Sequence, residues 1–244
     1  MGVQSVDRTV EVLEALAAKG GTSVNSIAAQ LGVHKSTASR ILSSLAEHGL
    51  VEKDALTGSY RLGFGLVRLA SAVTSRMDLS QIAQKLCDDV SAELGLTANV
   101  AVLDEIYAVN VSQAMGPGLL APRHYVGLRT PGHATSSGKM LLAHHPRAAE
   151  AAMHSTLEPH TDRTITDPQA LAAELERVRE RGWAGSDEEW EQHITAVAVP
   201  LRLPDGAVEA ALTVTGPAHS LQPDRFSDVA HRLREFAAGS SRWV

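Results

Sequence analysis

The 244-residue chain is 44% hydrophobic and 20% charged, the composition of a globular protein large enough for more than one core. Its net charge of −6 argues against a protein that coats DNA regardless of sequence, because that mode depends on neutralising phosphates. No apolar run approaches the ~20 residues that span a bilayer, and the N-terminus lacks a signal-peptide pattern. The single cysteine, Cys87, excludes an intrachain disulfide. We therefore expect a cytoplasmic protein without a membrane partner.

The first three predicted elements are helices. The apolar residues of the first helix recur at helical spacing: Val6, Val10, Leu13 and Ala17. Gly20-Gly21 ends this helix, and Thr22 and Ser23 offer N-cap oxygens to a short second helix. Gly32 then supplies a tight turn before the third helix.

The third helix, recognised from residues 33–42, has two chemically opposite faces. Its apolar stripe consists of Ala38, Ile41, Leu42 and Leu45. Its other face carries cations and small hydroxyls with no carboxylate: Lys35, Ser36, Ser39, Arg40 and Ser43. Solvent-facing helices usually mix their charges. A one-sided face of this kind instead suits the phosphates and base edges of DNA.

A hairpin is predicted after the third helix, which ends at Gly49. Strands over residues 50–53 and 59–62 flank a Thr57-Gly58 turn. This order of helices, turn and wing is the winged helix-turn-helix pattern, in which the last helix enters the major groove. The predicted DNA contacts are Lys35, Ser36, Thr37, Ser39 and Arg40 on the helix and Arg61 on the wing, with Tyr60 as a further wing candidate. A small structural bundle would explain the apolar stripes but not the one-sided polar face.

Charge and helical periodicity suggest the domain limits. Residues 1–76 carry eight basic and six acidic side chains, a charge of +2, which leaves −8 for the rest of the chain. This asymmetry fits one domain that faces nucleic acid and one that does not. We predict a winged helix-turn-helix domain over residues 1–63, a linker helix over 64–77 and a second domain over 78–244.

The second domain is predicted to combine antiparallel strands with helices. Strands over residues 98–103 and 106–111 follow a helix over 79–94, and strands over 196–201 and 207–215 flank a Pro204-Asp205-Gly206 turn. Further helices are expected over residues 136–143, 146–155, 168–181 and 223–238. Antiparallel pairs with inserted helices favour an α+β sensor domain over a doubly wound parallel sheet.

Short motifs along nearly the whole chain resemble those of IclR-type transcriptional regulators. Each motif is weak alone, but together in this order they are specific: Ser5-Val6-Asp7-Arg8, Leu31–Thr37, His133–Lys139, Arg181-Gly182-Trp183, Asp187-Glu188-Glu189 and Thr213–Pro217. The resemblance implies a winged helix-turn-helix, a linker helix and a GAF-like α/β effector-binding domain with an antiparallel sheet. It also implies a homodimer or dimer of dimers on a pseudo-palindromic double-stranded DNA operator, and a small-molecule effector.

A candidate effector site begins with Ser136, Ser137 and Gly138 at the start of a predicted helix. Free N–H groups and the helix dipole attract anions there, and small residues allow a ligand carboxylate to approach. The resemblance extends this site to Asp187 of the acidic segment, to the hydroxyls of Thr213 and Thr215 and to an apolar wall of Leu119, Pro122, Thr130 and Ala196. Ala196 and the two threonines depart from relatives that carry cysteine and serines at those positions.

Enzymatic interpretations of the same segment fail on its sequence. Five residues, not the four of a P-loop, separate Gly132 from Gly138, and Met140 replaces the hydroxyl that binds magnesium. Ser136–Lys139 matches the Ser-x-x-Lys pattern of penicillin-recognising enzymes, but their Ser-Asp-Asn and Lys-Thr-Gly segments are absent. The eleven histidines show no convincing zinc spacing. We therefore expect no catalytic residue, no metal and no cofactor.

The sequence thus predicts a ligand-responsive, sequence-specific transcriptional regulator rather than an enzyme. We expect a repressor that senses a small organic molecule, with a carboxylate as the natural candidate. The alternative is a stand-alone small-molecule-binding module whose winged helix mediates protein contacts.

Overall fold

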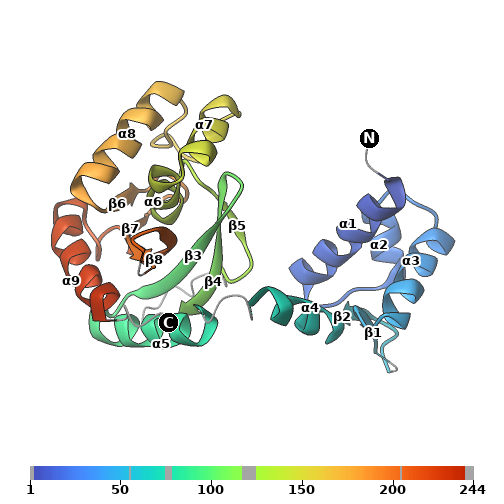
Figure 1. Cartoon of the computed structure of the whole chain (residues 1–244). Coiled ribbons are helices and arrows are strands. Elements are labelled where there is room, and N and C mark those ends of the chain that lie inside the picture. The colour runs from blue at the N-terminus through green and yellow to red at the C-terminus, as the bar shows by residue number, and fades with distance from the viewer. Residues whose placement is uncertain (1–2, 55, 75–78, 117–124, 204, 240–244) are drawn as a thin grey trace. The chain divides into compact units, whose positions relative to one another are not determined.

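The computed structural model describes residues 3–54, 56–74, 79–116, 125–203 and 205–239 (Figure 1). The chain divides into two compact units, Met1–Met77 and Asp78–Val244, each with its own hydrophobic core. Within the described ranges, no helix is long and apolar enough to cross a membrane.

The first unit is a bundle of helices with a two-stranded hairpin. Its elements are α1 (Gln4–Lys19), α2 (Val24–Gln30), α3 (Lys35–Glu47), β1 (Val51–Lys53), β2 (Tyr60–Leu62) and α4 (Gly65–Thr74). Gly32, at φ +61°, makes the turn between α2 and α3. The hairpin is antiparallel, with Glu52 opposite Arg61. The winged helix-turn-helix predicted from the sequence is confirmed.

The face of α1 that is buried in the core is not the face that carries the Val6 and Val10 repeat. Val12, Ala15 and Leu16 enter the core of the first unit. Val6 and Val10 remain 57% and 48% exposed. Two apolar stripes therefore share α1, and the stripe of Val12, Ala15 and Leu16 is the one that stabilises this unit.

Tyr60 belongs to the core and not to the outer surface of the wing. Its side chain is buried, and its backbone exchanges hydrogen bonds of 2.8 and 2.9 Å with Thr22. The side chain cannot reach a DNA backbone from this position. The prediction of Tyr60 as a wing contact is therefore wrong, because the inward alternation of the strand places it under the hairpin.

The second unit is built on a six-stranded antiparallel sheet in the order β5-β4-β3-β8-β7-β6. Its strands are β3 (Thr97–Asp104), β4 (Tyr107–Ala114), β5 (Arg129–Pro131), β6 (Ala184–Asp187), β7 (Ile194–Arg202) and β8 (Val208–Pro217). The two predicted hairpins, β3–β4 and β7–β8, meet at the centre of the sheet through β3 and β8. The α+β class is confirmed, whereas the short edge strands β5 and β6 lie outside the predicted set.

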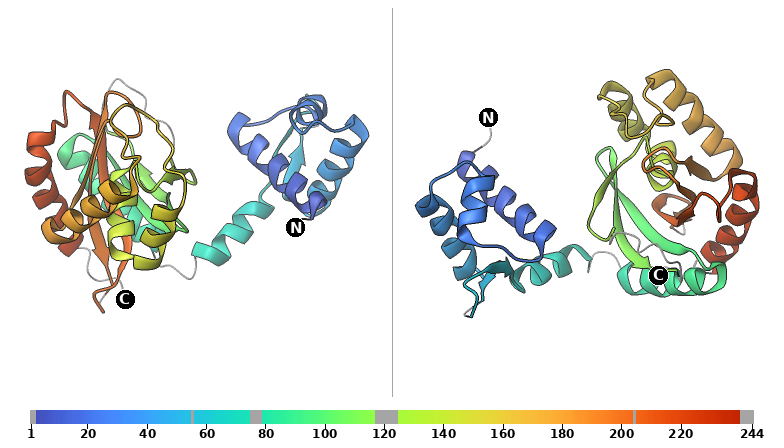
Figure 2. Two further views of the ribbon diagram at one scale, coloured as in Figure 1. Left: turned by 90° about the horizontal axis from the view of Figure 1, so that it is seen from above. Right: turned by 180° about the vertical axis from the view of Figure 1, so that it is seen from behind.

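Helices cover both faces of this sheet (Figures 1 and 2). One face packs against α6 (Ser136–His144), which is backed by α7 (Pro146–His154) and α8 (Pro168–Arg181). The other face packs against α5 (Leu79–Leu94) and α9 (Phe226–Gly239), which follows the short 3₁₀ helix η1 (Pro223–Arg225). Residues 136–143 of α6 are all buried, so this helix is an internal element of the unit.

Candidate nucleic-acid interface and ligand cavity

The polar face of α3 presents two exposed cations. Lys35 and Arg40 are exposed, and neither makes a hydrogen bond or ion pair within the described ranges. Thr37 and Ser39 are partly exposed on the same helix. No acidic residue lies in the first turn of α3, so the positive end of the helix dipole adds to the attraction for an anion.

A groove between α1 and α3 extends this interface. Arg40 lines the groove together with Arg8 of α1. Its hydroxyl-bearing residues are Ser5, Thr9, Thr37, Ser39, Ser43 and Ser44. Arg8 is missing from the predicted contacts, which were confined to the third helix and the wing, although it lies within one of the motifs quoted above.

Two of the predicted DNA contacts already have partners on the chain. The hydroxyl of Ser36 lies 3.0 Å from Nδ1 of His34, the residue whose side chain caps α3. Arg61 Nη2 lies 3.1 Å from a carboxylate oxygen of Glu52. An exposed ion pair of this kind contributes only ~0–1 kcal/mol. Arg61 can therefore exchange Glu52 for a phosphate at small cost.

A cavity in the second unit lies between the start of α6 and the sheet. The volume within it that the centre of a water molecule can occupy is about 50 Å³. About 10–15 Å³ on this scale holds one water, so the cavity suits a small organic molecule. Six of the nine predicted effector-site residues line it: Thr130, Ser136, Ser137, Ala196, Thr213 and Thr215. Two of the others, Leu119 and Pro122, lie outside the described residues.

The rest of the described lining was missed by the sequence-based predictions. These residues come from strands, from the cap of α6 and from the segments before β5 and after β6: Asn99, Asn110, Tyr125, Thr135, Ser186, Trp190, Glu191 and Ile194. One signal was available, because asparagine is depleted in strands and Asn99 stands within an otherwise apolar strand.

Among the described residues, three buried polar atoms in the cavity lining find no hydrogen-bond partner. They are Asn99 Oδ1, Ser136 Oγ and Thr213 Oγ1, in side chains that are at least nine-tenths buried. A buried polar atom without a partner costs ~1–3 kcal/mol, and folded proteins contain few of them. Their gathering around one cavity indicates a site for a ligand with polar groups.

The N-terminus of α6 adds backbone donors to this cavity. Thr135 caps the helix, because its Oγ1 accepts the N–H of Gly138 at 3.2 Å. The N–H groups of Ser136 and Ser137 have no partner within the helix at this position. A Cβ on Gly138 would lie 2.4 Å from the Cα of Gly132. Glycine thus allows the helix to start against this chain segment with its first donors facing the cavity.

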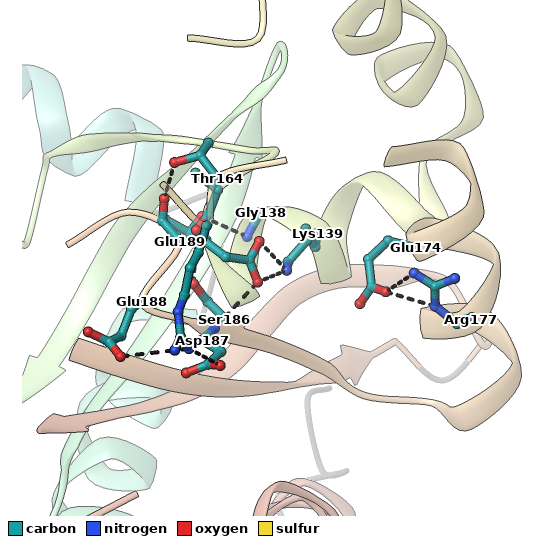
Figure 3. Close-up of polar contacts among 12 residues, drawn as sticks. Gly138, Lys139, Thr164, Glu174, Arg177, Ser186, Asp187, Glu188 and Glu189 are labelled. Carbon is teal, nitrogen blue, oxygen red and sulfur yellow. Dashed lines mark hydrogen bonds and ion pairs between the residues drawn. The ribbon is translucent and has the colours of Figure 1, made fainter. Parts of the chain in front are cut away.

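The acidic segment after β6 contributes less directly than the sequence suggested (Figure 3). Asp187 forms an ion pair with Arg163 and does not line the cavity. Its neighbour Ser186 does line the cavity and donates to the carbonyl of Ala134 at 2.9 Å. Successive side chains of a strand point to opposite faces, so Asp187 points away. The predicted ligand contact of Asp187 has no support in this geometry.

Glu189 and Lys139 form a buried ion pair beside the cavity (Figure 3). Nζ of Lys139 lies 2.5 and 2.6 Å from the two carboxylate oxygens, and the lysine side chain is 1% exposed. Burial raises the pKa of the Glu189 carboxyl, and the charge of Lys139 opposes this shift. The pair fixes α6 to the segment that carries Trp190 and Glu191, and thereby joins two walls of the cavity.

Other reactive side chains do not form a second site. Among the described residues, no group of histidine, cysteine, aspartate and glutamate is placed to hold a metal. Cys87 is fully buried on α5, and burial raises the pKa of its thiol to about 12.

Family models and known proteins match both units of the chain. The model of the IclR helix-turn-helix domain matches residues 5–55, and that of the bacterial transcriptional regulator IclR C-terminal domain matches residues 71–242. The chain is 31% identical over 238 residues to the HTH-type transcriptional regulator BhcR of Paracoccus denitrificans, covering 97% of this chain and 85% of that protein. It is 30% identical to the HTH-type transcriptional repressor AllR of Salmonella typhi, covering 97% and 88%. A solved IclR homologue from Microbacterium hydrocarbonoxydans, complexed with 4-hydroxybenzoate, superposes with a TM-score of 0.84 at 28% identity, covering 97% of each chain.

Proposed function

The chain belongs to the IclR family of DNA-binding transcriptional regulators, and we propose that it represses its target genes under the control of a small organic acid bound in the cavity. The family is one of regulators and not of enzymes. Repression is supported by the relative AllR, which is named as a repressor.

The hydrogen-bond donors at the start of α6 support a carboxylic acid as the effector. An ionised carboxylate only accepts hydrogen bonds. It therefore complements the N–H groups of Ser136 and Ser137 and the unpartnered hydroxyls of Ser136 and Thr213. The 4-hydroxybenzoate bound by the Microbacterium homologue is an acid of this kind and supports the proposal. Thr130, Thr215 and Ala196 shape the remaining wall.

We further propose that the DNA target is a pseudo-palindromic operator bound by a homodimer or a dimer of dimers. Two copies of a helix-turn-helix related by a twofold axis match two half-sites of such an operator. On each copy, Lys35, Thr37, Ser39 and Arg40 would contact the groove, while Ser36 and Arg61 approach the backbone.

The test combines DNA retention with acid binding. Full-length protein is mixed with DNA from upstream of its own gene and run on a native gel against excess unrelated competitor DNA. We expect retention that resists the competitor and that changes when benzoate, 4-hydroxybenzoate or lactate is added. Retention that disappears with competitor would contradict sequence-specific binding and favour a winged helix that contacts protein.

A further inference from the structure

We propose that the cavity selects acids that also carry a hydroxyl group, and that Asn99 and Thr213 form the subsite that recognises this hydroxyl. The proposal rests on the proposed function, since it takes the acid group to lie at the start of α6. It adds a second point of recognition on the strands.

Asn99 and Thr213 are direct partners in the sheet. The antiparallel β3–β8 pair places them opposite each other, so their side chains share one face. Ala101 and Ala211, two residues further along the same strands, pack into the core cluster that contains the buried residues of α6. Asn99 and Thr213 are 3% and 4% exposed, and both line the cavity below α6.

A carboxylate alone leaves this subsite incomplete. Carboxylate oxygens can accept from Thr213 and Ser136, but the unpartnered Oδ1 of Asn99 requires a donor. A hydroxyl both donates and accepts, so one ligand hydroxyl can donate to Asn99 and accept from Thr213. If the side-chain amide of Asn99 is flipped, its NH₂ group donates to the ligand hydroxyl, and the ligand hydroxyl donates to Oγ1 of Thr213. The ligand hydroxyl therefore complements the pair in either orientation of the amide.

The neutral character of this subsite narrows the ligand class further. The Asn99–Thr213 pair itself is neutral and buried, and a buried ammonium group needs a paired charge. A small hydroxy acid that places no ammonium group at this pair fits these conditions.

Isothermal titration calorimetry with matched acids tests the subsite. The full-length protein is titrated with propanoate, isobutyrate and lactate, and with benzoate, 4-methylbenzoate and both 3- and 4-hydroxybenzoate. The methyl analogues resemble the hydroxy acids in shape but cannot donate. In at least one series we expect the hydroxy acid to bind at least about tenfold more tightly than its unsubstituted and methyl analogues. This factor corresponds to one well-formed hydrogen bond.

Two variants assign the preference to the subsite. Asn99→Leu and Thr213→Val should each reduce the advantage of the hydroxy acid to less than about threefold. The matched control is Thr195→Val, because Thr195 is an equally buried strand threonine whose hydroxyl donates to the carbonyl of Leu221 at 2.6 Å and does not line the cavity. Thr195→Val should leave the preference unchanged. Without ligand, Thr213→Val should melt at a higher temperature than the wild type, because it removes an unpartnered polar group, and Thr195→Val at a lower one.

The possible failures can be told apart. Equal binding of acids with and without the hydroxyl, or a preference that survives both variants, overturns the subsite while leaving the acid effector in place. Failure of every acid to bind the wild type overturns the acid effector and the subsite together. Thr213→Val preserves shape, so it decides the question even where Asn99→Leu does not fold.

Discussion

Arg40 carries an exposed guanidinium that pairs with no residue of the described ranges and lies beside the hydroxyls of α3. If it reads a guanine, Arg40→Ala should weaken binding to the specific site by ~1–3 kcal/mol. A footprinting titration at fixed salt measures this change. Arg232→Ala removes an arginine that pairs with Glu93 in the second unit and should leave affinity unchanged. Unaltered affinity and base preference in Arg40→Ala would remove Arg40 from the set of base contacts.

Cys87 should be chemically silent in the folded protein. Its thiol is fully buried, and a pKa of about 12 leaves only ~1 in 10,000 molecules as thiolate at pH 8. Ellman's reagent should therefore react with the native protein far more slowly than with the protein in denaturant. Adding an exposed cysteine on α7 by Ala151→Cys provides the control, which should react at once. Rapid reaction of the native wild type would mean that α5 opens from the sheet.

At the residue scale, the sequence predicted those cavity residues whose position follows from the start of a helix. Ser136 and Ser137 could be predicted because a helix start fixes where its free N–H groups lie. Asp187 does not line the cavity, because the direction of its side chain depends on which residue of β6 faces inward, and the sequence did not reveal this four-residue strand. Asn99 was overlooked because one asparagine in a strand does not reveal whether a cavity or solvent lies beside it.

The ion pair between Lys139 and Glu189 is the contact that joins α6 to the segment after β6. Removing one member of a buried pair leaves an uncompensated charge, so Glu189→Gln should lower the free energy of unfolding by ~3–5 kcal/mol. Lys139→Met combined with Glu189→Gln should cost less than the sum of the single changes. Denaturation followed by tryptophan fluorescence reports on the second unit, because all three tryptophans belong to it.

An exposed ion pair provides the control for these changes at Lys139 and Glu189. Glu176 pairs with Arg179 on α8 with both side chains well exposed, so Glu176→Gln should change stability by less than ~1 kcal/mol. Additive effects of the two changes at Lys139 and Glu189 would show that the buried pair does not couple α6 to its neighbour.

Elements with long hydrophobic repeats were predicted more completely than short ones. The hairpins β3–β4 and β7–β8 have strands long enough for composition and turn residues to mark them. The three residues of β5 and four of β6 are too few for any period, and their pairing depends on partners distant in sequence. For α1 the helix was predicted, but two apolar stripes competed and periodicity alone could not identify the buried one.

At the scale of the whole molecule, the exposed stripe of α1 supports self-association. Val3, Val6 and Val10 lie one helical turn or two apart and are each about half exposed or more. Exposed apolar stripes on soluble proteins commonly mark interfaces. We expect analytical ultracentrifugation to show at least a dimer of the full chain, and Val6→Glu with Val10→Glu to shift it toward monomer and weaken operator binding.

The matched control for this prediction lies on the same helix. Ala18 is exposed near the C-terminal end of α1, eight residues beyond Val10, so Ala18→Glu adds a charge to the helix outside the Val3, Val6 and Val10 stripe and should leave the association state unchanged. A wild-type chain that sediments as a monomer at concentrations where it binds DNA would contradict the dimeric assembly.

The complete burial of α6 has a consequence for how the protein can acquire new effectors. Every residue from 136 to 143 is surrounded by other parts of the unit, so nearly any substitution there disturbs packing before it alters ligand chemistry. The facing strands carry side chains whose polar ends serve the cavity rather than the core. If the effector binds as proposed, single replacements at positions such as Asn99 or Thr213 should exchange one effector for another while α6 continues to hold the acid group.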